Sequence, residues 1–289
     1  MFAITAITGK VGGAVARHLL RAGKTVRAVV RDEAKGVHWA ALGCDLAVAD
    51  LGDAGPLAAA FAGADGVFIL LPPVFDPEPG FPEVQAAIAV IKEAVVRAAP
   101  PKIVVLSTIG ADTDRPNLLN ALRFLEQALA DLPMPITFLR AAWFMENAEW
   151  DVALAREQGV IASYLQPLDR PIAMVATDDV GRAAADLLCE HWEGHRVVEL
   201  EGAERVTPNA IAAAFAATLG KPVVAHNVPR DNWEEIFREQ GMKNPLPRMQ
   251  MIDGFNAGWI DFSDNGARAR KGEISIEQAV AALVAKHTG

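Results

Sequence analysis

The sequence predicts an α/β fold, with a doubly wound parallel sheet followed by a smaller C-terminal α/β cap. Short β-rich runs alternate with longer helical patterns from the N-terminus to Arg140, and this alternation is typical of βαβ units. Two of the runs, Val67–Leu71 and Ile103–Leu106, are apolar throughout, as strands of a parallel sheet covered on both faces are. Aromatic and methionine residues become dense after Arg140, which indicates a second part built in a different way.

The order of the elements follows from the same alternation. In the first part, strands are expected at Ala3–Thr8, Thr25–Val30, Asp65–Leu71, Lys102–Ser107 and Ile136–Leu139. Helices are expected between them at Val11–Arg21, Gly55–Phe61, Phe81–Ala98 and Asn117–Leu132. In the second part, the pattern predicts two helices and a strand between them, at Asp178–His191, Thr207–Thr218 and Arg196–Leu200. We therefore expect residues 1–150 to form one domain and residues 151–289 mainly a cap, with residues 172–192 packing back on the first domain.

The composition excludes several classes of function. The chain has 289 residues, 52% of them hydrophobic, and a net charge of −9 that no basic block offsets, so nucleic acid is not an expected partner. No run approaches the roughly 18 apolar residues of a membrane helix, and the N-terminus lacks the layout of a signal peptide. Cys44 and Cys189 have no CxxC partner and predict no disulfide framework. We expect a cytoplasmic protein, monomeric or homodimeric, that binds a small molecule and no membrane.

The strongest motif is a glycine-rich turn between the first expected strand and the first expected helix, Ala6-Ile7-Thr8-Gly9-Lys10-Val11-Gly12-Gly13. Such a turn places backbone N–H groups at the positive end of a helix dipole, which suits a pyrophosphate. Glycine is needed where a Cβ would block the approach of phosphate or the packing of helix on strand. Ala6 replaces the usual first glycine, and we expect a modest shift of the turn to absorb its methyl group. The motif predicts a Rossmann-type dinucleotide site that includes Thr8, Gly9, Lys10, Val11 and Gly12.

The end of the second expected strand, Val29-Val30-Arg31-Asp32, predicts which dinucleotide is preferred. A carboxylate near this point binds the ribose 2′-OH of NAD, whereas an arginine accommodates the 2′-phosphate of NADP. Val30 occupies the expected acid position, Arg31 follows it, and Lys35 lies one helical turn further on. With Lys10 as a third positive charge, these residues favour NADP(H), since a guanidinium matches a phosphate well. Asp32 does not exclude NAD(H), and a solvated Arg31–Asp32 pair is the structural alternative.

With these motifs the chain resembles, over essentially its whole length, the NmrA-like branch of the atypical short-chain dehydrogenases/reductases. The segments that carry the resemblance are the glycine turn, the arginine-ended strand, an Asp-Leu turn, an Arg…Phe-Met-Glu-Asn segment and a later helix start, at Ala6–Gly13, Val26–Asp32, Ala49–Asp53, Leu139–Asn147 and Thr177–Gly181. Ala141 stands where the family commonly has proline. The branch includes NADPH-dependent quinone and triphenylmethane-dye reductases and a eukaryotic NADPH-sensing regulator.

The resemblance also implies further site residues. It places Asp50 and Leu51 at the adenine. It places the nicotinamide between two segments that contribute Leu71, Pro72, Trp143, Phe144 and Asn147. The Pro-rich stretch Pro72–Pro82, which follows a central strand, predicts either a rigid connector or a lid over the ligand.

The side chains expected for acid catalysis are missing. Most short-chain reductases use a tyrosine as proton donor, with a lysine four positions later. Tyr164 is the only tyrosine here, it has no lysine four positions later, and no lysine occurs between Lys102 and Lys221. The helix expected to carry the pair has Leu118 and Leu122 at the aligned places. No catalytic residue is therefore assigned.

Three further features of the sequence bear on the site. Ser107 ends a central strand, where open α/β sheets bind ligands, so contact with the nicotinamide ribose and a hydrogen bond that caps the strand are both open. Arg140 either binds substrate or forms a buried ion pair, whereas Glu126 is expected to be solvated. The six histidines are scattered, so no metal site is expected.

Together with the resemblance, these observations predict an NADPH-dependent reductase that transfers a hydride to an electron-poor conjugated or aromatic molecule, such as a quinone or dye. Such an acceptor delocalises the incoming electrons and takes its proton from water, so positioning of the reactants suffices. The missing tyrosine–lysine pair also favours an alternative from a different class, a non-catalytic NADP(H)-sensing regulator that binds a partner protein.

Overall fold

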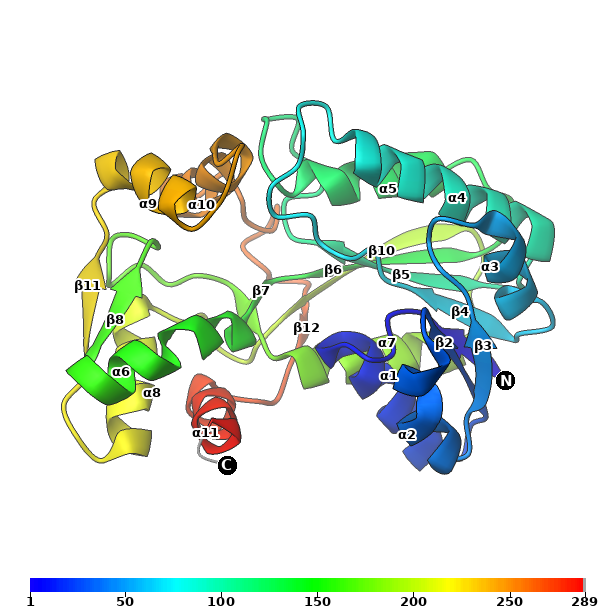
Figure 1. Ribbon diagram of the computed structural model, residues 1–289, viewed down its shortest axis with the longest axis horizontal. Helices are drawn as coiled ribbons and strands as arrows, with labels where there is room; N and C mark the ends of the chain where they lie inside the picture. Colours follow the sequence, from blue (N-terminus) through cyan, green and yellow to red (C-terminus); the bar gives the residue numbers. More distant parts are fainter. Residues whose placement is uncertain (288–289) are drawn as a thin grey trace.

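The chain folds around one large parallel sheet. The computed structural model describes residues 1–287. Eight parallel strands lie in the order β12-β10-β6-β5-β4-β1-β2-β3 (Figure 1). Their bounds are β1 Phe2–Ile4, β2 Val26–Val30, β3 Asp45–Val48, β4 Gly66–Ile69, β5 Ile103–Thr108, β6 Ile136–Ala141, β10 His195–Glu201 and β12 Arg270–Lys271. The predicted doubly wound sheet is confirmed, because the chain moves outward from β1 on one side and then from β4 on the other.

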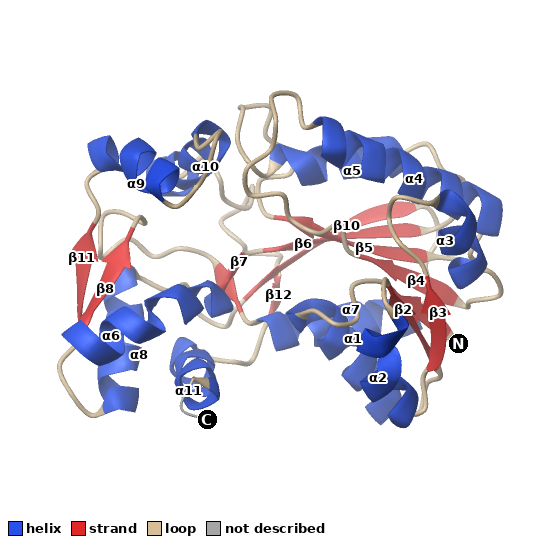
Figure 2. Ribbon diagram, viewed as in Figure 1, coloured by secondary structure: helices blue, strands red, loops and turns tan. Residues whose placement is uncertain are grey.

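Helices cover both faces of this sheet (Figure 2). One face carries α1 Lys10–Arg21, α2 Val37–Ala41 and α7 Thr177–Cys189, and the other carries α3 Ala54–Phe61, α4 Pro82–Ala98 and α5 Asn120–Leu129. The buried side chains of β5 alternate between the two layers: Val104 and Leu106 join the core beneath α1 and α7, and Val105 joins the core beneath α3 to α5. Burial on both faces explains why the central strands are apolar at successive positions.

Elements from the second half of the chain complete this layered unit. Helix α7 lies directly against α1, where a Cβ on Gly181 would come within 2.3 Å of the Ala14 Cβ. Only glycine permits so close an approach of two helices. Strands β10 and β12 extend the sheet beyond β6. Residues on both sides of position 150 therefore build the large sheet and its helices.

The remaining elements form the smaller α/β cap, at the left of Figure 1. Two short parallel strand pairs belong to it, β8 Val160–Ser163 with β11 Val224–Asn227 and β7 Trp143–Phe144 with β9 Met174–Val175. Its helical segments are η2 Met145–Asp151, α6 Val152–Gln158, α8 Pro208–Leu219, η3 Arg230–Asn232, α9 Trp233–Glu239, α10 Leu246–Ala257 and α11 Ile276–Lys286. Phe215, Trp233 and Phe237 are fully buried here, so many of the dense aromatic residues serve packing.

The expected and observed elements differ at short strands and at helices α2, α6, α9, α10 and α11, which the sequence pattern did not predict. Strands β3, β7, β8, β9, β11 and β12 were not expected, and each is only two or four residues long. Segments this short show no readable alternation, and their pairing partners lie far away in the sequence. Among residues 1–287, no helix combines the length and the apolar character needed to cross a membrane.

Candidate functional site

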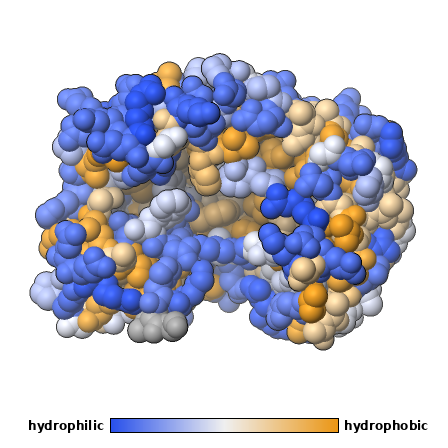
Figure 3. All heavy atoms as spheres, in the orientation of Figure 1, coloured by the Kyte–Doolittle hydropathy of each residue, from blue (hydrophilic) through white to orange (hydrophobic). Residues whose placement is uncertain are grey.

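The candidate site is a crevice at the carboxyl ends of the central strands. The order of the sheet reverses between β1 and β4, and open α/β sheets bind ligands at such a switch point. The carboxyl ends of the strands face the cap (Figure 1), and the surface is hollowed between the two parts, with apolar side chains on its floor (Figure 3). The crevice therefore has a sheet wall and a cap wall.

The glycine loop connects β1 to α1 on the sheet wall. Ala6 takes the left-handed conformation, with φ of 50°, and its carbonyl accepts a hydrogen bond of 2.9 Å from the Gly9 N–H. The turn thus keeps a glycine-like backbone with Ala6 strained, instead of the modest shift that we expected. Thr8 and Gly9 are exposed at the tip. Helix α1 has no side-chain cap and no acidic residue in its first turn, so its first N–H groups are available to an anion.

Gly12 makes the close approach that this loop requires. A Cβ at Gly12 would lie 2.3 Å from the Ala6 carbonyl oxygen and 2.8 Å from that of Thr5. Both are backbone atoms, which cannot rotate away as a flexible side chain can. The Thr5 hydroxyl donates to the Phe68 carbonyl (3.1 Å) and accepts from the Leu70 N–H (2.9 Å). The cradle between β1, α1 and β4 is therefore rigid and fits a phosphate held by backbone groups.

Two cations lie at the end of β2, the strand that pairs with β1. Arg31 follows the strand directly, and Lys35 lies in the short helix η1 Glu33–Gly36. Asp32 caps that helix by accepting a hydrogen bond of 3.0 Å from the Ala34 N–H. Both cationic side chains are exposed, and neither forms a hydrogen bond or ion pair within residues 1–287. The two charges are therefore free to meet a phosphate.

Lys10, the third expected cation, is held by the cap. Its ammonium donates to the Glu149 carboxylate at 2.6 Å, and Lys286 donates to the other oxygen at 2.8 Å. These hydrogen bonds, chiefly the one from Lys10, lower the pKa of Glu149 to about 2. A cavity of about 470 Å³ opens beside them, with walls from α1, α7 and α11. The structure therefore brings Lys10 together with Glu149, not with Arg31.

The residues expected at the adenine and nicotinamide follow β3 and β4. Asp50 is exposed, and its carboxylate accepts a hydrogen bond of 2.8 Å from the Gly52 N–H within the same turn. Leu51 is half-buried, Leu71 is buried and Pro72 is exposed. Because β3 and β4 lie on opposite sides of β1, these residues border the crevice from both sides of the glycine loop.

The loop after β4 is tied to the cap. The Asp76 carboxylate accepts hydrogen bonds from the backbone N–H groups of Lys243 (2.8 Å) and Asn244 (2.6 Å), between α9 and α10. The hydrogen bond from Lys243 is the main cause that lowers the pKa of Asp76. The Pro-rich stretch therefore acts as a connection between the sheet and the cap in this structure.

Ser107 is directed into the layer between the sheet and α5. Its hydroxyl donates to the Glu126 carboxylate, which also accepts hydrogen bonds of 2.9 and 2.7 Å from Arg140. The side chains of Glu126 and Arg140 are 12% and 13% exposed, so the prediction of a solvated Glu126 was wrong. The physical reason is that a buried guanidinium needs a carboxylate as its partner. The Ser107 hydroxyl thus contacts a partly buried ion pair, and its contact with the nicotinamide ribose stays a prediction.

The aromatic segment after β6 forms part of the cap wall. The Trp143 ring meets the Phe255 ring of α10 edge to face, with centroids 5.1 Å apart. Phe144 is partly buried, and Asn147 is exposed. The Glu146 carboxylate between them accepts from the first N–H of α7, at 2.9 Å from each oxygen. This segment therefore holds the first turn of α7 through Glu146 and contributes the Trp143 ring to the cap wall.

No tyrosine–lysine pair lies at the crevice in the described part of the chain. Leu118, just before α5, is buried, and Leu122, in its first turn, is half-buried. Tyr164 packs in the cap against Trp233 and Phe237, with ring centroids 5.7 and 5.2 Å apart. Burial raises the pKa of Tyr164, which disfavours its phenolate. Residues 1–287 also contain no group of three His, Cys, Asp or Glu side chains placed to hold a metal ion.

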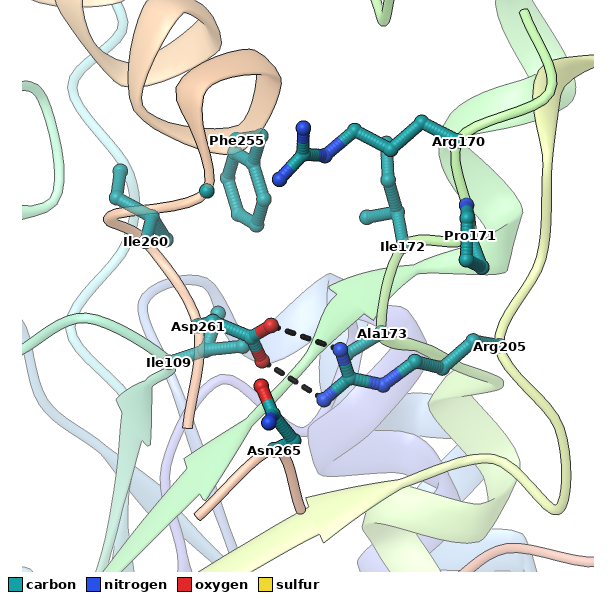
Figure 4. A pocket seen from close by; sticks show the side chains of 11 residues that line it. Ile109, Arg170, Pro171, Ile172, Ala173, Arg205, Phe255, Ile260, Asp261 and Asn265 are labelled. Carbon is teal, nitrogen blue, oxygen red and sulfur yellow. Dashed lines mark hydrogen bonds and ion pairs between the residues drawn. The ribbon is translucent and has the colours of Figure 1, made fainter. Parts of the chain in front are cut away.

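Phe255 also lines a cavity of about 360 Å³ that the sequence did not reveal (Figure 4). Its polar side chains, Arg170, Arg205, Asp261 and Asn265, come from three separate segments of the chain. No motif or spacing connects these segments in the sequence, so no local signal marks the cavity.

An open, doubly wound parallel sheet with a glycine loop at its switch point defines the Rossmann class of α/β proteins. Within this class, residues 2–263 match the NmrA-like family, and the chain belongs to that family. The resemblance seen in the sequence motifs is thereby confirmed.

Curated relatives and a solved structure extend the match over most of the chain. The chain is 29% identical to the NAD(P)H azoreductase of Xenophilus azovorans over 251 residues, 85% of this chain and 83% of the relative. It is 29% identical to quinone oxidoreductase 2 of Escherichia coli over 253 residues, 86% of this chain and 85% of the relative. An NADPH-dependent quinone oxidoreductase of Escherichia coli, solved in complex with NADPH, matches with a TM-score of 0.80 and 25% identity over 100% of both chains.

Proposed function

We propose that this protein is an NADPH-dependent reductase of an electron-poor conjugated or aromatic molecule, such as a quinone or dye. The observation that carries the proposal is the rigid glycine cradle at the switch point, with Arg31 and Lys35 at the end of the neighbouring strand and no side-chain partner for either within residues 1–287. The curated relatives support it, because they are an NAD(P)H azoreductase and a quinone oxidoreductase.

The residues of the sheet wall fit NADP(H). The first N–H groups of α1 suit the pyrophosphate, and Gly12 leaves the space that a Cβ would fill. Arg31 and Lys35 suit the 2′-phosphate, because a guanidinium offers two parallel donors to phosphate oxygens. The Lys10 ammonium already donates to Glu149, and its remaining N–H donors could contact a phosphate. Further cofactor contacts are proposed for Asp50, Leu51, Leu71, Pro72, Trp143, Phe144 and Asn147.

The reaction needs no side-chain acid when the acceptor is electron-poor. When bound, the cofactor supplies a hydride; the acceptor gains this hydride and one proton from water, and is thereby reduced by two electrons. The contribution of the chain is to hold the reactants together, which is worth about 7–11 kcal/mol in favourable geometry. The apolar floor and the Trp143 ring suit a planar acceptor, since aromatic rings contact one another favourably.

The test is oxidation of NADPH by the purified protein with a panel of quinones, enones and dyes, with NADH in parallel. Turnover of one acceptor class with a preference for NADPH is expected. Simple aliphatic ketones should be poor substrates, because their alkoxide product needs a proton donor. Efficient turnover of such ketones would contradict the mechanism.

A complete absence of turnover, together with tight NADPH binding by the same preparation, would contradict the reductase. That combination would instead support a non-catalytic NADP(H)-sensing regulator. Titration of the protein with NADPH, followed by tryptophan fluorescence, supplies the binding measurement in the same experiment.

A further inference from the structure

The cavity beside Phe255 has an apolar wall and a charged floor (Figure 4). Its volume of about 360 Å³ is in the range of small-ligand pockets. The apolar wall is formed by Ile109, Ile172, Phe255 and Ile260. A body of one or two aromatic rings therefore matches the wall in size and in polarity.

The charges in the cavity are unbalanced. Arg205 on the floor is neutralised, because Asp261 accepts two hydrogen bonds of 2.7 and 2.8 Å from it and Glu201 accepts a third of 3.2 Å. Arg170 lines the opposite side, and its guanidinium forms no hydrogen bond or ion pair within residues 1–287. The cavity therefore keeps one uncompensated positive charge, which a ligand anion would balance.

The Arg170 guanidinium is placed by its backbone surroundings. One of its nitrogens lies against the Cα of Gly258, where a Cβ would come within 2.2 Å. Figure 4 shows the side chain extending toward the Phe255 ring. The guanidinium is thus presented beside an aromatic ring and is not folded onto an acidic residue.

The cavity shares a wall with the expected acceptor position. Phe255 contacts the Trp143 ring, and the carbonyl of Ala173, another cavity residue, accepts a hydrogen bond of 3.2 Å from the Trp143 N–H. Trp143 is the aromatic residue proposed to flank the nicotinamide. A molecule that reaches from Trp143 past Phe255 would therefore place its far end at Arg170.

We propose that this cavity binds the anionic group, a carboxylate or sulfonate, of an aromatic acceptor, with Arg170 as its counter-ion. The inference rests on the proposed reductase function and assigns the substrate class: conjugated acceptors with a negative charge at one end. A guanidinium recognises both oxyanions through the same pair of parallel N–H donors. A cationic acceptor is repelled by the same charge.

The test compares 1,4-naphthoquinone with its 2-sulfonate in the wild-type protein and in Arg170→Gln. For each acceptor, the kcat/KM of the variant is divided by that of the wild type, so differences in intrinsic reactivity cancel. For the sulfonate, we expect the kcat/KM of Arg170→Gln to be about tenfold or more below that of the wild type, which is the scale of a charge-assisted hydrogen bond. For the neutral quinone, the two values should differ less than about twofold. Arg170→Lys, which keeps the charge, should retain part of the preference.

Arg97→Gln is the matched control, because Arg97 is an exposed arginine of α4 that pairs with Glu93. The kcat/KM of Arg97→Gln should equal that of the wild type for both quinones. An equal loss for both quinones in Arg170→Gln would overturn the proposal, because it would mean that Arg170 only supports the fold. A kcat/KM for the sulfonate that is the same in Arg170→Gln as in the wild type would overturn it as well.

A binding measurement separates this inference from the reductase itself. Calorimetric titration with naphthalene-2-sulfonate, which cannot be reduced here, should show binding to the wild type and about tenfold weaker binding to Arg170→Gln. If no acceptor is turned over but this difference is present, the reductase fails and the anion site stands. If quinones are reduced but the sulfonate binds both proteins equally, the anion site fails and the reductase stands.

Discussion

The two walls of the crevice are built from different parts of the polypeptide. On the sheet wall, the close contacts join backbone atoms: Gly12 lies on the carbonyls of Thr5 and Ala6. On the cap wall, the contacts join side chains, as in the Trp143–Phe255 ring pair and the cavity beside it. The sheet wall uses neighbouring residues of one loop, whereas the cap wall collects residues from distant segments.

This difference suits the two requirements that the proposed function sets. Every nicotinamide dinucleotide carries the same pyrophosphate, and backbone N–H groups recognise its phosphates without depending on side-chain identity. An acceptor varies, and side chains on a cap can be replaced without disturbing the sheet. We therefore expect an added atom in the backbone cradle of the sheet wall to impair folding and cofactor binding, and a changed charge on the cap wall to alter which acceptor is used.

The largest expected effect comes from an added methyl group on the sheet wall. In Gly12→Ala the new Cβ would overlap three backbone atoms of Thr5 and Ala6, the nearest at 2.3 Å, so the loop must move. We expect the free energy of unfolding to fall by about 3 kcal/mol and NADPH binding to be lost. Urea denaturation and fluorescence titration measure the two quantities.

Gly55→Ala is the control for this substitution. Gly55 lies in α3, and a Cβ there would meet only the Asp53 carboxylate oxygen at an ordinary 3.4 Å. This variant should be as stable as the wild type or slightly more stable, because alanine favours helix. Equal losses in the two variants would show that the Gly12 contact is not special.

The second expected effect concerns Arg31, one of the two cations that the sheet wall contributes at the end of β2. In Arg31→Ala, NADPH affinity should fall roughly tenfold to hundredfold, the range of charge-assisted hydrogen bonds, while NADH affinity stays nearly the same. The asymmetry is expected because only NADPH carries the 2′-phosphate. Titration of one preparation with both cofactors measures it. Equal losses for the two cofactors would mean that Arg31 stabilises the loop and does not bind the 2′-phosphate.

The same contrast explains what could be predicted from the sequence. The central strands and the glycine loop were predictable, because their signals lie within runs of about four to eight neighbouring residues. The pairing of Lys10 with Glu149 was not, since the two residues meet only after the cap has folded onto α1. The buried Glu126 was mispredicted for a related reason: its partner Arg140 lies on a strand, and the polarity of a helix residue does not show what it faces.

The third prediction tests whether the cap contains a charge that lowers its stability. Asp151 lies at the end of η2, where burial raises the pKa of its carboxyl to about 6 from 3.8. The folded state therefore binds the proton more tightly, and the contribution of Asp151 to stability falls as the pH rises from about 4 to above 6. We expect Asp151→Asn to raise the free energy of unfolding by about 1–2 kcal/mol at pH 7.5 and to have little effect at pH 4.

The amide of this variant can still accept the hydrogen bond of the Ala162 N–H, which is 3.2 Å long in the structure. Asp131→Asn is a control of opposite sign, since a hydrogen bond from Lys92 lowers the pKa of Asp131. That control should gain no stability at pH 7.5. A gain for Asp151→Asn that does not depend on pH would rule out the burial of its charge as the cause.

The smallest expected effect returns to the sheet wall and removes a methyl group instead of adding one. Ala6 has a φ of 50°, and the left-handed conformation costs an alanine about 1–2 kcal/mol, of which the flexibility of glycine in the unfolded chain offsets roughly half. Ala6→Gly should therefore raise the free energy of unfolding by about 0.5 kcal/mol.

Ala99, which ends α4 with a φ of 43°, offers the matched control away from the crevice. Ala99→Gly should give the same gain, and neither change should alter NADPH affinity by more than about twofold, because the Ala6 loop already has the backbone that binds phosphate. A loss of stability in Ala6→Gly alone would show that its methyl group contributes packing that outweighs the strain.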